Sequence, residues 1–313
     1  MDYRFKLVSY SDEGPLDDAA VLFKRPFAAI HNSFEKDAQR FVPGDELEAA
    51  INAALAVGAP LLITGEPGTG KTQAAYYTAY KLGVEPVLHF QVKSDSSAAD
   101  LLYYFDAVRY FHDANLNRGE ESNGSFSKTN YVEKRLLWEA LESDMPRVLL
   151  IDEIDKAPRD FPNDLLHELD KMEFKIAETQ TVVRAEPKMR PIVFITSNSE
   201  RRLPEPFLRR CAYHHIQFDE QLLRKAVKSR VSDYGRLSAD FVELAIRRFL
   251  ALRSKPLRKL PSTAELFVWL QVMAAAADTS PEFLSDNLAR LPYLGALLKD
   301  QNDIEDVKAS YAK

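Results

Sequence analysis

The chain has 313 residues, a net charge of −6 and a single cysteine, Cys211. This length predicts about two domains, and hydrophobic and charged fractions of 46% and 28% are those of a soluble globular protein. No apolar run approaches the ~20 residues of a membrane-spanning helix, and the N-terminus lacks the pattern of a secretory signal. One cysteine excludes an internal disulfide framework, which favours the cytosol, and the acidic balance argues against general affinity for nucleic-acid backbones.

The first part of the chain leads into a buried strand. Residues 1–44 are rich in turn formers and predict an irregular lead-in. From Asp45, apolar residues recur at helical spacing as far as Gly58, which predicts a helix. The apolar run 61–64 then predicts the first central strand.

A glycine-rich loop follows that strand and fits the pattern G-x-x-x-x-G-K-[ST]. Such a loop points backbone N–H groups at a phosphate, and the helix that follows adds its positive end. Lys71 would reach the β- and γ-phosphates, and the Thr72 hydroxyl would ligate Mg²⁺. The alternative is a glycine turn before an ordinary helix. The candidate nucleotide-binding residues are Gly65, Glu66, Pro67, Gly68, Thr69, Gly70, Lys71 and Thr72.

Helices and apolar strands alternate beyond the loop. The pattern predicts a helix over 72–81 and a strand over 85–92, and such buried strands separated by helices indicate a parallel sheet. Residues 96–114 and 131–143 then predict helices, and the polar stretch 115–130 between them predicts a mobile surface loop.

The next apolar strand ends in two carboxylates, Asp152 and Glu153. The carboxyl ends of parallel strands are where α/β folds place their sites, so both side chains should lie beside the phosphate loop. Asp152 would hold the hydration shell of Mg²⁺, and Glu153 would polarise the attacking water. The alternative is a solvated acidic turn.

A third set of polar residues follows. An amphipathic helix at 161–170 and a hairpin at 172–188 precede the strand 191–198, whose last residue is Asn198. If this strand neighbours the loop strand, Asn198 would emerge beside the γ-phosphate. Two basic residues, Arg209 and Arg210, sit at the end of a short helix, and the alternative for them is a solvated basic surface.

The rest of the chain predicts a second, all-helical domain. Four segments look helical, and Ser262 or Thr263 as N-cap, with Glu265 in the first turn, predicts a helix start. The polar end of the chain predicts a loosely held helix. The helical segments are 220–232, 238–253, 262–277 and 281–298, and the predicted domains are 1–44, 45–219 and 220–313.

In this order, the motifs GEPGTGKT, VLLIDEIDKA, ITSN and FLRRC followed by a helical tail resemble those of the AAA+ ATPases. The phrases between them, such as SDSSAADLLYYFDAVRYFHD and RPIVFITSNSERRLPEPFLRRC, resemble the MoxR-like branch of that superfamily. The resemblance extends from about residue 41 to residue 300. It implies an α/β P-loop NTPase, with a five-stranded parallel sheet in an αβα core and a C-terminal helical lid. It also implies a hexameric ring with ATP and Mg²⁺ at each subunit interface.

The resemblance also implies residue roles. Lys71 and Thr72 match the Walker A motif, Asp152 and Glu153 the Walker B motif, and Asn198 sensor 1. The remaining matches are the arginine finger at Arg210 or Arg209, the adenine-binding stretch at Phe41 and Val42, and two candidate client-gripping segments at 92–130 and 172–188. Gln91, at the end of the second strand, could switch Glu153 by hydrogen bonding. One departure stands out. Ala264 lies where many relatives carry the sensor 2 arginine, for which Arg258 or Lys259 could substitute.

The function implied is a chaperone-like ATPase that remodels or activates a protein client, with a partner carrying a von Willebrand factor A domain. Neither membrane insertion nor nucleic-acid binding is expected. The alternatives are a nucleic-acid motor or restriction-type GTPase with the same core, a monomeric P-loop kinase, and a nucleotide-regulated scaffold with little turnover. The missing sensor 2 arginine keeps the scaffold open.

Overall fold

A computed structural model describes residues 34–116, 127–276 and 279–311 of the chain. Two compact units are present. The first comprises Asp37–Glu66 and Gly70–Gln217, and the second contains Phe218–Lys313 together with Pro67–Thr69. Most of the predicted lead-in lies outside the described residues, and the predicted domain boundaries stay predictions.

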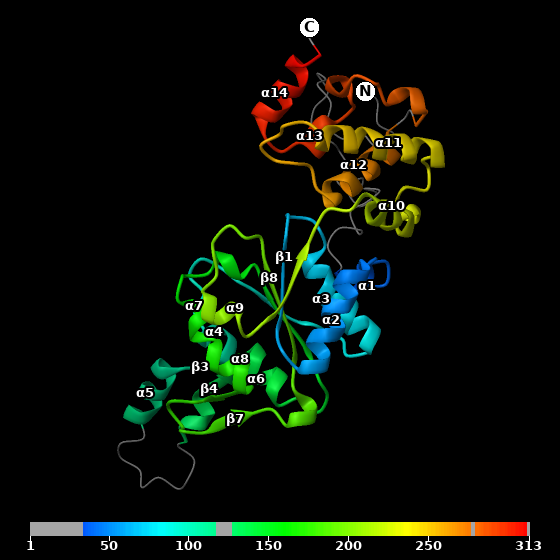
Figure 1. The fold of residues 1–313 in the computed structure, drawn as a ribbon. Coiled ribbons are helices and arrows are strands. Elements are labelled where there is room, and N and C mark those ends of the chain that lie inside the picture. The colour runs from blue at the N-terminus through cyan, green and yellow to red at the C-terminus, as the bar shows by residue number, and fades with distance from the viewer. Residues whose placement is uncertain (1–33, 117–126, 277–278, 312–313) are drawn as a thin grey trace, which may run out of the picture. The chain divides into compact units, whose positions relative to one another are not determined.

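Five parallel strands form the centre of the first unit, in the order β2-β5-β8-β1-β9 (Figure 1). The strands are β1 (Leu61–Gly65), β2 (Leu88–Gln91), β5 (Val148–Asp152), β8 (Ile192–Ser197) and β9 (Ala212–Ile216). In register, Thr64 lies opposite Ser197 of β8, and Ile151 of β5 lies opposite Ile195. The predicted fold class, an α/β P-loop core with a five-stranded parallel sheet and a helical C-terminal region, is confirmed.

Helices cover both faces of this sheet, which explains why β1 and β5 are continuous apolar runs. Leu61 and Ile63 point to one face and share a core cluster with residues of α2 and α3, whereas Leu62 points to the other face. The helices of the first face are α2 (Asp45–Val57) and α3 (Lys71–Leu82), with α1 (Phe34–Ala38) beside them. Those of the second are α4 (Ala99–Leu102), α6 (Leu136–Leu141), α7 (Phe161–Asp164), α8 (Leu166–Lys171) and α9 (Glu205–Leu208).

The excursion after β2 differs from the predicted pair of helices. Helical structure is interrupted by a small antiparallel pair, so the continuous helices expected over 96–114 and 131–143 were wrong. The elements are β3 (Tyr103–Phe105), α5 (Ala107–Leu116) and β4 (Val132–Lys134). The aromatic residues of β3 favour extended backbone, and the ring of Tyr103 stacks on Phe174 at 6.1 Å. Part of the predicted mobile loop, 117–126, lies outside the described residues.

Residues 161–184 form two short helices and a hairpin. The predicted single helix over 161–170 is divided into α7 and α8 at Leu165. The predicted hairpin is confirmed, because β6 (Glu173–Lys175) and β7 (Val182–Arg184) pair antiparallel, with Phe174 opposite Val183.

The second unit is a helical bundle around one apolar core. Its helices are α10 (Glu220–Ser229), α11 (Ala239–Arg253), α12 (Thr263–Ala275), α13 (Leu294–Leu297) and α14 (Gln301–Ala309). The predicted capped helix start is confirmed, and Ser262 is the N-cap rather than Thr263, because Ser262 and Glu265 exchange hydrogen bonds at the start of α12. The predicted helix over 281–298 was wrong. Short turns precede α13 there, and Pro292 removes a backbone donor that a helix would need. None of the helices in the described residues is both long and apolar enough to cross a lipid bilayer.

The C-terminal helix α14 is anchored rather than loosely held. Asp303, 1% exposed, accepts hydrogen bonds from the backbone N–H groups of Arg258 and Lys259, both at 2.9 Å. Replacing Asp303 with Ala leaves two N–H groups without this acceptor, so we expect the free energy of unfolding of this unit to fall by about 1–3 kcal/mol. Urea denaturation followed by circular dichroism measures the change. Asp306→Ala, on the exposed face of the same helix, should stay within about 0.5 kcal/mol of the unsubstituted chain.

Candidate nucleotide-binding site

The glycine-rich loop connects the carboxyl end of β1 to the first turn of α3. Gly70 is needed there for two reasons: its φ is 96°, and a Cβ atom would lie 2.7 Å from the ring of Phe41. The side chain of Lys71 folds back over the loop, where Nζ donates to the carbonyl oxygens of Gly65 and Glu66, both at 2.9 Å. The loop therefore holds a buried cation at the position where the pattern calls for one.

Lys71 is 6% exposed. Burial lowers the pKa of its ammonium group below the usual value, and the carboxylates of Asp152, Asp155 and Glu153 oppose part of that effect. A phosphate placed in the loop would supply the negative charge that a buried ammonium lacks, so the site favours an anionic ligand.

Asp152 ends β5 and is bound from three other elements. Its carboxylate accepts hydrogen bonds from Thr72 of α3 (3.0 and 3.2 Å), Thr196 of β8 (2.5 Å) and His89 of β2 (3.2 Å). Burial alone would raise the pKa of Asp152, but the hydrogen bonds from His89, Thr196 and Thr72 hold it below its usual value. The carboxylate is therefore ionised at neutral pH.

The oxygens of Thr72 and Asp152 fit Mg²⁺. Both are hard donors, and they lie side by side at the mouth of the loop. Within residues 34–116, 127–276 and 279–311, no group of three or more His, Cys, Asp or Glu side chains is arranged to hold a metal ion. A donor set of one hydroxyl and one carboxylate suits Mg²⁺, which usually takes one or two carboxylates and completes its shell with phosphate and water.

Glu153 follows Asp152 in a left-handed conformation, with a φ of 59°. This backbone is uncommon for a residue with a side chain, and the Thr196 hydroxyl stabilises it by accepting the Glu153 N–H at 2.8 Å. Its carboxylate accepts hydrogen bonds from Gln91 (2.7 Å), Lys156 (2.5 Å) and Asn198 (3.2 Å). The predicted hydrogen bond between Gln91 and Glu153 is thus confirmed, and Asn198 lies beside Glu153.

A second buried carboxylate fixes the loop that carries Asn198. Asp155 is 3% exposed and accepts the backbone N–H groups of Asn198 (3.2 Å) and Glu200 (2.9 Å). The turn after β5 is therefore tied directly to the turn after β8. This connection sets the distance between Glu153 and the Asn198 amide.

The predicted adenine-binding stretch, Phe41 and Val42, lies against helix α3. The ring of Phe41 packs edge to face on Tyr77 of α3, with ring centroids 5.6 Å apart, and it contacts Gly70 of the loop. Val42 follows it and is half-buried. Phe41 therefore lies beside Gly70 of the loop, and its role in binding adenine stays a prediction.

Arg209 and Arg210 lie at the amino-terminal ends of the strands, whereas the loop lies at the carboxyl ends. They directly precede β9, whose first residue, Ala212, is opposite Leu61 at the start of β1. From Leu61 to Gly65 the strand rises about 13 Å, so neither arginine is beside the loop of its own chain. Arg209 pairs with Glu205 (3.3 Å) and is largely exposed, and Arg210 donates to the carbonyl of Pro206 at 2.9 Å.

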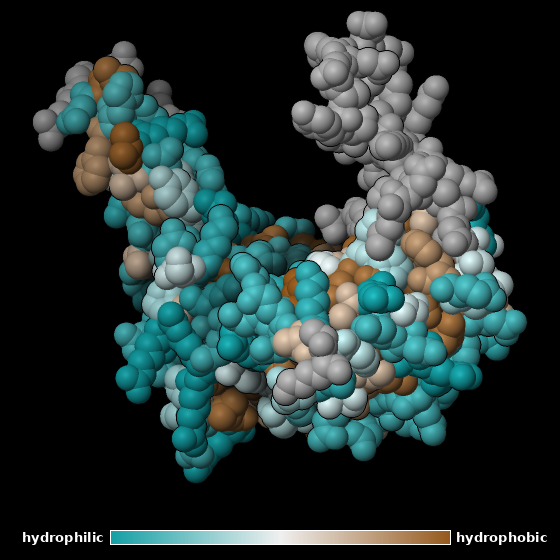
Figure 2. All heavy atoms as spheres, turned by 90° about the horizontal axis from the view of Figure 1, so that it is seen from above, coloured by the Kyte–Doolittle hydropathy of each residue, from teal (hydrophilic) through white to brown (hydrophobic). Residues whose placement is uncertain are grey.

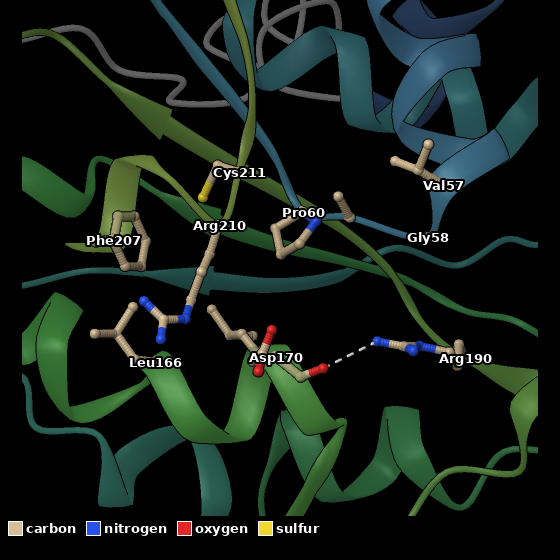
Figure 3. Close-up of a pocket in the computed structure, with 11 residues that line it drawn as sticks. Val57, Gly58, Pro60, Leu166, Asp170, Arg190, Phe207, Arg210 and Cys211 are labelled. Carbon is tan, nitrogen blue, oxygen red and sulfur yellow. Dashed lines mark hydrogen bonds between the residues drawn. The ribbon is translucent and has the colours of Figure 1, made fainter. Parts of the chain in front are cut away.

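Arg210 also lines a pocket of about 240 Å³ at this amino-terminal edge (Figure 3). Pro60, Leu166 and Phe207 form apolar walls, and Arg190 donates to the backbone carbonyl of Asp170. Burial raises the pKa of the Cys211 thiol, which also lines this pocket, to about 12. Such a thiol stays protonated at neutral pH and is a poor nucleophile.

Three residues of this site were missed by the sequence analysis: His89, Tyr76 and Asp155. His89 is a polar residue between the apolar Leu88 and Phe90 of β2, and that irregularity was the available signal. Tyr76 looks like any core aromatic of α3. Asp155 follows the two recognised carboxylates, and only the folded turn shows that it binds backbone N–H groups.

Comparisons with known proteins agree with this geometry. Residues 60–211 match the AAA domain of the dynein-related subfamily. None of the curated proteins compared with the chain matches it.

Solved structures that are similar to this chain include the following two. One is NtrX from Brucella abortus in complex with ADP, with 14% identity, a TM-score of 0.50, and coverage of 93% of this chain and 65% of that one. The other is a candidate ATPase from Cytophaga hutchinsonii, with 15% identity, a TM-score of 0.40, and coverage of 88% and 83%. At 14% sequence identity, the similarity to NtrX is evidence for the fold and not for a shared function. Over residues 60–211, which carry the phosphate loop and the paired carboxylates, the chain therefore resembles the AAA domain of the dynein-related subfamily.

Proposed function

We propose that the chain is a MoxR-like, Mg²⁺-dependent ATPase of the cytosol that works as a homo-hexameric ring. One observation carries the proposal. The carboxyl ends of the strands carry a cluster formed by Lys71, Asp152, Glu153 and Asn198, whereas Arg210 lies at the amino-terminal ends of the strands. The first group supplies what hydrolysis of a bound nucleotide needs. The arginine would act on a nucleotide that another subunit binds.

Each residue of the first group has a task that its position supports. The Lys71 ammonium would leave the carbonyls of Gly65 and Glu66 and bind the β- and γ-phosphates. Thr72 and Asp152 would hold Mg²⁺, which when bound neutralises charge on the phosphates. Glu153 would accept a proton from the attacking water, and the Asn198 amide, 3.2 Å from Glu153, would orient that water.

We propose that Arg210 is the arginine finger and acts on the neighbour's γ-phosphate, with Arg209 as the alternative. An arginine about one strand length from its own loop is remote from the phosphates there. In a head-to-tail ring, the same edge would face the loop of the next subunit.

The client would be a protein, reached through a partner with a von Willebrand factor A domain. Two features support contact with a protein surface. On α5, Val108, Phe111 and Leu116 are 80%, 63% and 71% exposed, and hydrophobic spheres are visible at the left of Figure 2, where α5 lies in Figure 1. The hairpin of β6 and β7 also exposes Val182. Exposed apolar side chains that gather on one element mark interaction sites.

A second candidate function is a nucleotide-regulated scaffold with slow turnover. Glu153 accepts hydrogen bonds from Lys156 as well as from Gln91, so its carboxylate must leave these partners before it can contact an attacking water. In addition, Ala264 lies where the resemblance places a sensor 2 arginine; of the two possible substitutes, Arg258 and Lys259, the Arg258 guanidinium lies 3.8 Å from Asp300. These observations favour low basal activity that a partner could raise.

The proposed function is tested by measuring mass and turnover together. We expect light scattering to find six chains per particle with ATP and Mg²⁺, and phosphate release to require Mg²⁺. Six-chain particles with very slow release would favour the scaffold. A particle that stays monomeric with every nucleotide while transferring phosphate to a small molecule would favour the kinase and contradict the proposal.

A further inference from the structure

The carboxylate of Asp152 accepts hydrogen bonds from both neighbouring strands. On the β8 side, the Thr196 hydroxyl donates to Oδ1. On the β2 side, Nε2 of His89 lies 3.2 Å from Oδ2. Because β5 lies between β2 and β8 in the sheet, these two contacts fix the plane of the carboxylate from opposite sides.

The contacts of His89 define its tautomer. An ionised carboxylate only accepts hydrogen bonds, so Nε2 must carry the proton. Nδ1 lies 3.0 Å from the Tyr76 hydroxyl, which donates to it when the imidazole is neutral. Tyr76 is 5% exposed, and its ring meets that of His89 edge to face at 5.9 Å. The imidazole is therefore held in one orientation by a buried phenol of α3.

We infer that His89 is a positioning residue that holds Asp152 in the orientation needed to bind the metal ion of the nucleotide site. The inference rests on the proposed function. Thr72 bonds Asp152 in the structure, but its hydroxyl oxygen would turn toward the ion once one is bound. His89 would then carry the orientation of Oδ2, with Tyr76 behind it.

The expected effect is on metal affinity. Loss of a side chain that hydrogen-bonds a metal ligand typically weakens metal binding by about 10–100-fold. Mn²⁺ takes the same oxygen ligands as Mg²⁺ and can be followed by electron paramagnetic resonance. We expect His89→Ala to raise the half-saturating Mn²⁺ concentration in the presence of ADP by at least about tenfold. ADP binding in EDTA should stay unchanged.

Two further variants separate the hydrogen bond from ring packing. His89→Gln keeps an N–H donor without the ring, and His89→Phe keeps a ring without the donor. The inference predicts that His89→Gln recovers most of the Mn²⁺ affinity and that His89→Phe does not. Recovery by His89→Phe alone, recovery by neither variant, or normal Mn²⁺ affinity in His89→Ala would each overturn it.

This failure is distinguishable from failure of the proposed function. If the unsubstituted chain binds ADP more tightly with Mn²⁺ than in EDTA, the nucleotide and metal site stands, and the comparison of variants decides the role of His89. If the unsubstituted chain shows no metal-dependent binding of ADP, the proposed function fails and the inference fails with it.

Discussion

Replacing Glu153 with Gln is expected to lower the kcat for ATP hydrolysis by about 10²–10⁴-fold while ATP still binds. The amide cannot take a proton from water, although it fits the space of the carboxylate. Its oxygen can still accept a hydrogen bond from Gln91, Lys156 or Asn198, so the turn after β5 should keep its shape. Lys71 and Thr72, which would bind the phosphates and the metal ion, are untouched.

Steady-state phosphate release measures the loss, and fluorescence of a labelled ATP analogue measures binding. The matched control is Glu139→Gln, an exposed residue of α6 in the same unit, which should keep full activity. Unchanged turnover in Glu153→Gln would remove Glu153 from the chemistry. Loss of ATP binding in that variant would instead show that the carboxylate supports the site structurally.

Replacing Arg210 with Ala is expected to lower kcat by about 10³-fold or more, and the loss should be repaired by a second inactive variant. Arg210→Ala subunits keep a complete loop and Glu153, whereas Glu153→Gln subunits keep Arg210. Where an Arg210→Ala subunit binds the nucleotide and its Glu153→Gln neighbour supplies Arg210, the interface between them has a complete loop, Glu153 and Arg210. We therefore expect a mixture of the two variants to hydrolyse ATP faster than either alone.

The control for this experiment is Arg209→Ala, which removes the exposed partner of Glu205. If Arg209 is the finger instead, that variant will be inactive and will be rescued in the same way. A mixture that forms rings but never regains activity contradicts sharing between subunits. Full activity of both arginine variants would leave this edge of the sheet without a catalytic role.

The central sheet and the phosphate loop could be predicted because local sequence determines both. Buried strands are apolar throughout, and the loop needs glycines and a lysine at fixed spacing, so β1, β5 and β8 and the residues after them were found. Parallel strands place their carboxyl ends together, and this rule predicts that Asp152 and Asn198 lie near the loop.

The remaining features depend on contacts between distant segments. Residues 103–105 have helical neighbours, but they form a strand because β4 and Phe174 lie beside them. The role of His89 depends on β2 lying next to β5, and no local pattern specifies that order. The sequence suggests Arg210 as an arginine finger by resemblance alone. Its distance from its own loop follows from the pairing of β9 with β1.

The separation of Arg210 from Lys71 along the sheet also bears on how activity should depend on assembly. If each active site takes its loop from one chain and its arginine from the next, an open row of n subunits has n − 1 complete sites, because one end offers a loop that no arginine reaches. A closed ring has n. The gain from closure is largest for short rows, so dimers would work at half the rate per chain. Specific activity should then rise with protein concentration and level off once the rings have closed.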